Sequence, residues 1–322
     1  MCSSDLGLIP ESYLLKNSKG RFTDVSNTVP AISNIGMVTD AIWCDVDADG
    51  WKDLVLVGEW MPLTIFKNKN GILDSVPVKF ENTYGWWNAI AAKDLDGDGD
   101  IDLVGGNISA NSRYKCNAQY PMTMVASDFD NNGSTDCVIG LFQEGISYPI
   151  ALRDNMLDQM LFLKKKYLRY KNYSTAKLTD MFTAEQLSKA KKFQANTIAN
   201  TTFINSGIGV FTPQYLSTKA QIFPANAILI DDYNKDGNMD LLLAGNDYST
   251  EVESGRNDAG IGLMLYGTGD AKFKSVPVTE SGFYIPGDVK FMEKITIKNK
   301  PCIIVGKNKG AIQIVELTQE GN

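Results

Sequence analysis

D-L-D-G-D-G-D-I-D, from Asp94 to Asp102, is the clearest copy of a nine-residue motif that the chain contains four times. The other copies are D-V-D-A-D-G-W-K-D from Asp45, D-F-D-N-N-G-S-T-D from Asp128 and D-Y-N-K-D-G-N-M-D from Asp232. Every copy has an oxygen-bearing side chain at positions 1, 3, 5 and 9, and glycine at position 6. Glycine adopts the positive φ that a short loop folded around one point requires. The motif therefore predicts a loop whose oxygens converge.

So many carboxylates within nine residues repel one another unless a cation lies between them. Hard oxygen ligands of this number and spacing suit Ca²⁺, and the backbone carbonyl oxygen of position 7 would complete its coordination shell. Mg²⁺ fits less well, because it keeps its waters and seldom takes an all-protein cage. We predict four structural Ca²⁺ sites, with ligands from Asp45, Asp47, Asp49, Trp51 and Asp53; from Asp94, Asp96, Asp98, Asp100 and Asp102; from Asp128, Asp130, Asn132, Ser134 and Asp136; and from Asp232, Asn234, Asp236, Asn238 and Asp240.

An EF-hand shares the D-x-D-x-D-G opening, but it requires a bidentate Glu at position 12 and a helix on each side. Position 12 here is Leu56, Gly105, Ile139 and Leu243. The flanks are short apolar runs that end at glycine, such as L-V-L-V before Gly58, and such runs are typical of strands. One copy alone reads equally well as an acidic hairpin turn, but four copies in one frame favour a strand, cation loop, strand unit.

A strand, D-x-D-x-D-G-x-x-D and an apolar run closing on glycine resembles the FG-GAP or VCBS repeat of integrin α-subunit heads and many bacterial surface proteins. Three stretches resemble more narrowly the large VCBS-repeat proteins of Bacteroidetes, some of which carry an ASPIC/UnbV-type domain. They are Val57-Gly58-Glu59-Trp60-Met61-Pro62, Gly85-Trp86-Trp87-Asn88 and Gly245-Asn246-Asp247-Tyr248. The resemblance covers nearly the whole chain and implies a β-propeller in a secreted or cell-surface protein.

Hairpins without the motif alternate with the cation loops and are predicted over residues 13–25, 63–76, 202–211 and 263–276. An inner and an outer hairpin make a four-stranded unit, and repetition of such units every ~40–50 residues is typical of a β-propeller. We predict an all-β fold over residues 7–322, with about five blades plus the outer hairpin of a preceding one. The last blade, over residues 289–317, lacks a cation loop. A closed ring of roughly six to eight blades would need a missing N-terminal part of the same protein.

Successive motifs begin 49, 34 and 104 residues apart. The short interval predicts a blade with shortened outer strands after Asn107, and the long one contains an insertion. Between about 152 and 195 the apolar residues recur at helical spacing, and T-A-E-Q from Thr183 has the form of a capping box. We expect this helical insertion to pack on the propeller as a lid, and the alternative is a partner-binding element.

Composition excludes several classes of site. The chain has no histidine, which removes Ser-His-Asp and Cys-His nucleophiles, His-ligated zinc and a His general base. Five cysteines without a C-x-x-C pair predict no disulfide framework. The formal charge is −7 and the only basic cluster lies on the predicted helices, so nucleic acid is not an expected partner. No apolar run approaches the ~20 residues of a membrane-spanning helix.

The first six residues, M-C-S-S-D-L, match the translation of a common sequencing adapter, and we exclude residues 1–6 from the fold. We expect the natural protein to begin upstream, so the lack of a signal peptide does not bear on location.

Candidate contact residues for a partner lie outside the motifs. Three tryptophans are predicted just beyond strand ends, where they could stack on sugar rings or anchor a protein, and inter-blade packing is the alternative. These are Trp60, Trp86 and Trp87. The polar loop 249–260 could reach a ligand or serve as a solvated connection, and its candidates are Glu251, Arg256 and Asp258.

All motif ligands are protein oxygens, so the metal sites are predicted to be structural and not catalytic. The resemblance implies a calcium-stabilised, non-catalytic binding or adhesion module of a larger extracellular protein, with a protein or glycan partner. The alternative is an enzyme that acts on extracellular polysaccharide, similar to lyase-like propellers. The absence of histidine and of a recognisable acid and base pair favours the module. A carboxylate pair facing a cleft lined by Trp86, Trp87 and Arg256 would favour the enzyme.

Overall fold

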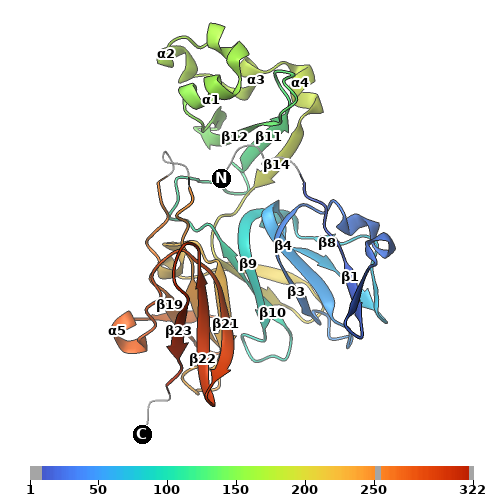
Figure 1. The fold of residues 1–322 in the computed structure, drawn as a ribbon, viewed down its shortest axis with the longest axis vertical. Coiled ribbons are helices and arrows are strands. Elements are labelled where there is room, and N and C mark those ends of the chain that lie inside the picture. The colour runs from blue at the N-terminus through green and yellow to red at the C-terminus, as the bar shows by residue number, and fades with distance from the viewer. Residues whose placement is uncertain (1–8, 251–254, 319–322) are drawn as a thin grey trace.

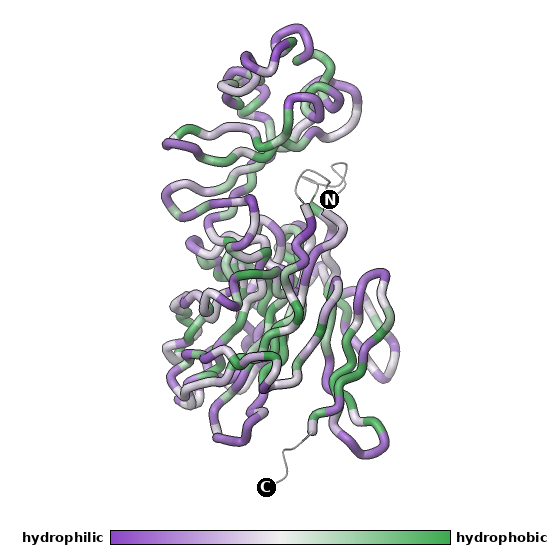
Figure 2. Tube along the Cα trace, turned by 90° about the vertical axis from the view of Figure 1, so that its left-hand side faces the viewer, coloured by the Kyte–Doolittle hydropathy of each residue, from purple (hydrophilic) through white to green (hydrophobic). Residues whose placement is uncertain are grey.

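The computed structural model describes residues 9–250 and 255–318, and its architecture is all-β, with 41% strand and 14% helix. The strands pair antiparallel into small sheets that stand side by side (Figure 1). Hydrophobic residues follow the packed strands, and hydrophilic residues gather at the turns between them (Figure 2). The predicted propeller-like all-β fold is confirmed. The proposed adapter residues 1–6 lie outside the described part of the chain.

Three four-stranded units have the form of a propeller blade, and in each the motif joins the first strand to the second. Blade 1 consists of β3 (Met37–Cys44), β4 (Asp53–Met61), β5 (Thr64–Phe66) and β8 (Val78–Lys79). Blade 2 consists of β9 (Gly85–Lys93), β10 (Asp102–Asn107), β15 (Thr201–Asn205) and β16 (Phe211–Tyr215). Blade 3 consists of β17 (Ala227–Asp231), β18 (Asp240–Ala244), β19 (Leu263–Gly267) and β20 (Phe273–Val276). Blades 1 and 2 are joined by hydrogen bonds into one eight-stranded sheet, and blade 3 is a sheet of its own.

A fourth unit, blade 4, has three strands and no motif, as the sequence predicts. It consists of β21 (Val289–Ile297), β22 (Lys300–Lys307) and β23 (Gln313–Glu316). Two hairpins complete the predicted set, β1 (Leu15–Ser18) with β2 (Arg21–Asp24), and β6 (Asn68–Lys69) with β7 (Ile72–Leu73). The short helices outside the insertion are η1 (Ser26–Thr28), η2 (Pro30–Ile32), η3 (Glu81–Thr83), η5 (Thr218–Gln221) and α5 (Val278–Ser281).

The first strands of the blades contact one another in the order β3, β9, β17, β21. β4 pairs antiparallel with both β3 and β9, so β3 and β9 run in the same direction and their motifs lie at the same end. Consecutive residues of a second strand pack against different blades. In β10, Leu103 packs with blade 1, whereas Val104 packs with blade 3. Because successive strand residues point to opposite faces, a blade between two others is apolar on both sides. This explains the continuous apolar runs in the sequence.

Residues 108–199 form an insertion between the second and third strands of blade 2. It has its own sheet, made of β11 (Met122–Ser127), β12 (Asp136–Gln143), β13 (Ile146–Pro149) and β14 (Lys191–Ala195). Its helices are α1 (Arg153–Gln159), η4 (Leu161–Lys165), α2 (Tyr170–Tyr173), α3 (Leu178–Met181) and α4 (Ala184–Lys189). The helices fall where the sequence predicts them, and the capping box at Thr183 is formed, with Gln186 donating its backbone N–H to the Thr183 hydroxyl.

Two expectations about this region are wrong. The blade with shortened outer strands after Asn107 does not form, because β10 pairs with β15 on the far side of the insertion, with Leu103 opposite Phe203. The third motif therefore belongs to the inserted sheet and not to the row of blades. The helices are also not a lid on the propeller. They pack on one face of the inserted sheet, through Val125 and Val138, and its other face covers Trp60 and Trp86 of the main body.

Candidate metal centres

The four motif loops share one backbone conformation. Position 6 has positive φ in every copy, as predicted: Gly50, Gly99, Gly133 and Gly237 have φ between 88° and 97°. Position 4 also has positive φ, although three of its four residues are not glycine: Ala48, Gly97, Asn131 and Lys235. Left-handed backbone at a non-glycine residue is unfavourable and persists only where surrounding contacts hold it. The varied residue types at position 4 did not indicate this second turn position.

Backbone N–H groups hold the acidic side chains in place. In every loop the carboxylate at position 1 accepts a hydrogen bond at Oδ2 from the glycine N–H at position 6, over 2.8 to 3.0 Å. The side-chain oxygen at position 5 accepts from the N–H of position 7, over 2.7 to 2.9 Å. Each hydrogen bond uses one lone pair of the accepting oxygen and leaves its other lone pair free to coordinate a cation.

The aspartate at position 9 is buried in every copy and bonds to two parts of its sheet. Its Oδ2 accepts from the N–H of position 2, in Val46, Leu95, Phe129 and Tyr233. In the three blades its Oδ1 accepts from a backbone N–H at the end of the third strand, in Asn205 and Gly267, or two residues after it, in Asn68, over 2.7 to 2.9 Å. In the inserted sheet the Gln159 side chain takes that place, at 3.2 Å from Asp136. Position 9 thus fastens the loop to the third strand.

Three of the predicted ligand positions converge in three of the four loops. In three loops, positions 1, 3 and 9 each offer an oxygen, and these oxygens lie within 4.8 Å of one another. In the fourth loop Asn234 stands at position 3, and its Oδ1 accepts from the Asp236 N–H at 3.0 Å. Carboxylate and amide oxygens are the donors that a hard divalent cation prefers.

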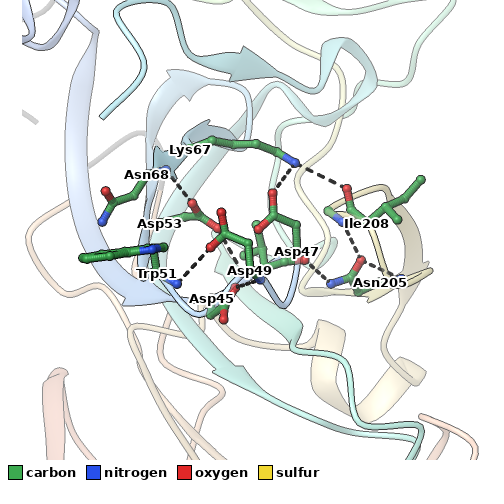
Figure 3. A network of polar contacts seen from close by, with 12 residues as sticks. Asp45, Asp47, Asp49, Trp51, Asp53, Lys67, Asn68, Asn205 and Ile208 are labelled. Carbon is green, nitrogen blue, oxygen red and sulfur yellow. Dashed lines mark hydrogen bonds and ion pairs between the residues drawn. The ribbon is translucent and has the colours of Figure 1, made fainter. Parts of the chain in front are cut away.

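Electrostatics also fit a cation. Burial raises the pKa of Asp102 to about 6, and it raises the pKa of Asp53, Asp136 and Asp240. Desolvation makes a charged carboxylate unfavourable unless positive charge compensates it. In the first loop Asp47 Oδ1 is buried without a hydrogen-bond partner, while its Oδ2 lies 2.8 Å from Lys67 Nζ (Figure 3). An unpartnered buried carboxylate oxygen in an acidic loop is a position where a metal ligand is expected.

The three candidate tryptophans do not lie where a ligand could stack on them. Trp60, Trp86 and Trp87 are 3%, 2% and 0% exposed. Trp60 and Trp86 pack edge to face, with ring centroids 5.1 Å apart, beneath the inserted sheet. Trp87 packs edge to face on Phe203, and its indole N–H donates to the Thr83 carbonyl at 2.9 Å. Packing between elements accounts for all three, because the inserted sheet and blade 1 cover the strand ends.

The polar loop between β18 and β19 of blade 3 is closed by two backbone hydrogen bonds between Asp247 and Asn257. Within it the Arg256 guanidinium lies over the Tyr248 ring, 5.4 Å from the centroid, and Asp258 is exposed. The structure does not bring Arg256 together with the tryptophans, because the latter are buried in the core. The third candidate of this loop, Glu251, lies outside the described residues.

A cavity of about 430 Å³ lies where the insertion joins blade 2. Its lining includes Tyr120, Tyr215, Asn117, Asn196 and Lys115. Exposed tyrosine rings beside amide groups can stack on and hydrogen-bond a sugar or a peptide side chain. The sequence did not indicate this cavity, because its residues come from segments about 100 positions apart.

Comparison with known proteins supports the repeat. Residues 45–105 match the family model described as an FG-GAP-like repeat, and the antiparallel sheets fit an FG-GAP repeat β-propeller. A solved structure of an Agrocybe aegerita lectin, described as recognising non-reducing terminal N-acetylglucosamine, shares 14% identity over 97% of this chain and 89% of that chain, with a TM-score of 0.24. A TM-score at that level carries no argument about fold or ligand. Among curated proteins none matches.

In the described ranges, residues 9–250 and 255–318, no helix is long and apolar enough to cross a bilayer.

Proposed function

We propose that this chain is a calcium-stabilised FG-GAP repeat propeller that serves as a non-catalytic binding or adhesion module of a larger secreted or cell-surface protein. The observation that supports the metal is the repetition of one loop geometry four times, with three carboxylates that converge in three of the loops. Among the described residues, the ion pairs place a lysine ammonium group on a motif carboxylate only at the first loop, where Lys67 contacts Asp47. Ca²⁺ suits these loops better than Mg²⁺, because it accepts many protein oxygens in irregular geometry. A bound Ca²⁺ would neutralise the carboxylates that burial makes unfavourable.

A structural role for the metal is favoured by where the loops are fastened. Each position 9 carboxylate accepts hydrogen bonds from its own loop and from the third strand or Gln159. A metal that neutralises this carboxylate would therefore stabilise the connection between three strands. Such a site would stabilise the fold without contacting a substrate.

Isothermal titration calorimetry tests the metal. We expect about four Ca²⁺ per chain, with Mg²⁺ binding much more weakly. Changing Asp98, an exposed position 5 ligand, to Ala should remove one site and leave the chain folded, because the hydrogen bond that its side chain accepts from the Asp100 N–H lies within its own loop. No measurable Ca²⁺ binding by the folded chain would refute the proposal.

For a partner, the cavity beside Tyr120 and Tyr215 is a candidate surface, because it combines exposed tyrosine rings with amide groups. Screening of immobilised glycans and of candidate protein ligands, with wild type and Tyr215→Ala, tests this role. Tyr215 is 70% exposed, so its loss should abolish partner binding without affecting the fold. The enzyme alternative has less support, because Trp86 and Trp87 are buried and form no cleft with Arg256.

A further inference from the structure

Lys67 places a positive charge at the first motif. It follows β5, and its Nζ lies 2.8 Å from Asp47 Oδ2 and 3.4 Å from the Ile208 carbonyl oxygen (Figure 3). The side chains of Lys67 and Asp47 are only 25% and 17% exposed, so water screens the ion pair weakly. The next residue, Asn68, donates its backbone N–H to Asp53 at 2.7 Å, which fixes the register of Lys67 relative to the loop.

The other blades lack this charge. The N–H groups that bond the position 9 carboxylates belong to Asn68, Asn205 and Gly267, so these three residues are structurally equivalent. The residues that precede them are Lys67, Ile204 and Tyr266. Only blade 1 therefore has a cationic side chain at this place. The first motif contains four aspartates and Lys52 and has the Lys67 ammonium group beside it, whereas the second motif contains five aspartates and no lysine.

The Lys67 ammonium also contacts a turn that connects two loops. Asn205 donates its amide to the carbonyl of Val46, in the first motif, at 2.8 Å and to that of Ile101, in the second, at 3.1 Å. Its Oδ1 accepts from the N–H groups of Gly207 and Gly209, which shapes the turn that carries Ile208. Lys67 thus links the first loop of blade 1 to the turn of blade 2 by contacts that need no metal.

We propose that Lys67 is a built-in counter-ion of the first loop, which holds that loop and its contact with blade 2 in the metal-free protein and weakens its affinity for Ca²⁺. The inference rests on the proposed Ca²⁺ binding. Asp47 Oδ1 remains buried and unpartnered, so the loop still offers a ligand while Oδ2 is held by Lys67. Affinity in such loops follows the count of ligand charges, and a nearby ammonium group repels the incoming cation. The first loop should therefore fill at a higher Ca²⁺ concentration than the second loop, which has five aspartates and no lysine.

Trp51 makes the first loop separately observable. It occupies position 7 and is 42% exposed, whereas position 7 of the other motifs is Asp100, Ser134 and Asn238. Tb³⁺ binds the oxygen ligands that Ca²⁺ uses, and its luminescence is excited by energy transfer from a nearby indole. Tb³⁺ emission on tryptophan excitation, and its loss on adding Ca²⁺, therefore report this loop. Trp51→Phe, which keeps the backbone carbonyl, should remove most of the signal and so confirms its source.

The test compares wild type with Lys67→Met, which removes the charge and keeps an apolar stem of similar length. We expect the variant to fill its first loop at about tenfold lower Tb³⁺ and Ca²⁺ concentrations, and to melt at a lower temperature than wild type in chelator. Lys67→Arg, which keeps the charge, should retain the wild-type midpoint. Lys300→Met is the matched control, because Lys300 forms an ion pair with Glu316 at 2.6 Å in the blade without a motif.

An unchanged or higher midpoint in Lys67→Met would overturn the inference, since Lys67 would then be neutral to the metal or would position Asp47 for it. Calorimetry of wild type separates the two proposals. If wild type binds Ca²⁺ and the midpoints coincide, only the role of Lys67 is wrong. If wild type binds no Ca²⁺, the proposed function and this inference both fail.

Discussion

Position 9 of the motif shows how one residue can serve both the loop and the sheet. Asp240 is fully buried, and it accepts hydrogen bonds from the backbone N–H groups of Tyr233 and Gly267, both at 2.9 Å. Position 5 differs, because Asp236 is exposed and accepts from within its own loop. The two positions carry the same residue type for different physical reasons, and a metal-free experiment can separate them.

Asp240→Ala should destabilise the chain by about 3 kcal/mol even in chelator, because the backbone N–H groups of Tyr233, Asn234 and Gly267 lose their acceptor. Asp236→Ala should cost less than about 1 kcal/mol in chelator, and its cost should be larger when Ca²⁺ is present. Urea unfolding with and without Ca²⁺ measures both. Equal costs for the two variants in chelator would contradict the assigned role of position 9.

Low pH should weaken Ca²⁺ binding at the second loop. Burial raises the pKa of Asp102 from 3.8 to about 6, so the folded, metal-free chain holds this proton more tightly than the unfolded chain does. That contribution to stability is present below pH 3.8 and is lost as the pH rises through about 6. Ca²⁺ requires the deprotonated carboxylate, so its stabilising effect should grow over the same interval. Melting curves at pH 5 and pH 7.5 should show the larger Ca²⁺-induced shift at pH 7.5, and a shift independent of pH would contradict this.

Among the elements, the insertion is the one that local sequence could not place. The motif loops and hairpins pair residues close in the chain, so patterns of apolar and turn residues predict them well. β10 instead pairs with β15, where Gly105 lies opposite Thr201, and no local pattern marks that pairing. Likewise, tryptophans at strand ends could either bind a ligand or pack beneath a neighbouring sheet. Local sequence does not distinguish these cases, because the answer depends on where the inserted sheet lies.

Removing the insertion tests its independence. Asn107 donates its N–H to Asn200 Oδ1 at 2.6 Å, so the two ends of the insertion are already close. A variant with residues 108–199 replaced by a short glycine linker should fold cooperatively and bind one Ca²⁺ fewer, because the third motif is gone. Fluorescence should shift to the red, since Trp60 and Trp86 lose contact with Met122 and Met124. A chain that fails to fold would show that the insertion belongs to the common core.

The whole molecule is a row of blades that share hydrophobic cores. Leu242 and Ala244 of blade 3 pack with blade 4, whereas Leu241 and Leu243 pack with blade 2. Blades 1, 2 and 3 each carry a motif loop between their first and second strands, and Asn205 connects the loops of blades 1 and 2. A metal in any of these loops would therefore stabilise more than its own hairpin. At a free Ca²⁺ concentration about 100 times the dissociation constant, each site would add about 2.7 kcal/mol to the free energy of unfolding.

Thermal unfolding of the purified chain in excess Ca²⁺, in excess Mg²⁺ and in chelator tests the central claim most directly. The four loops predict a large rise in melting temperature that is selective for Ca²⁺, because binding to the folded state alone shifts unfolding upward. A folded chain whose melting temperature is the same in Ca²⁺ and in chelator would show that the loops are acidic hairpins without a structural metal.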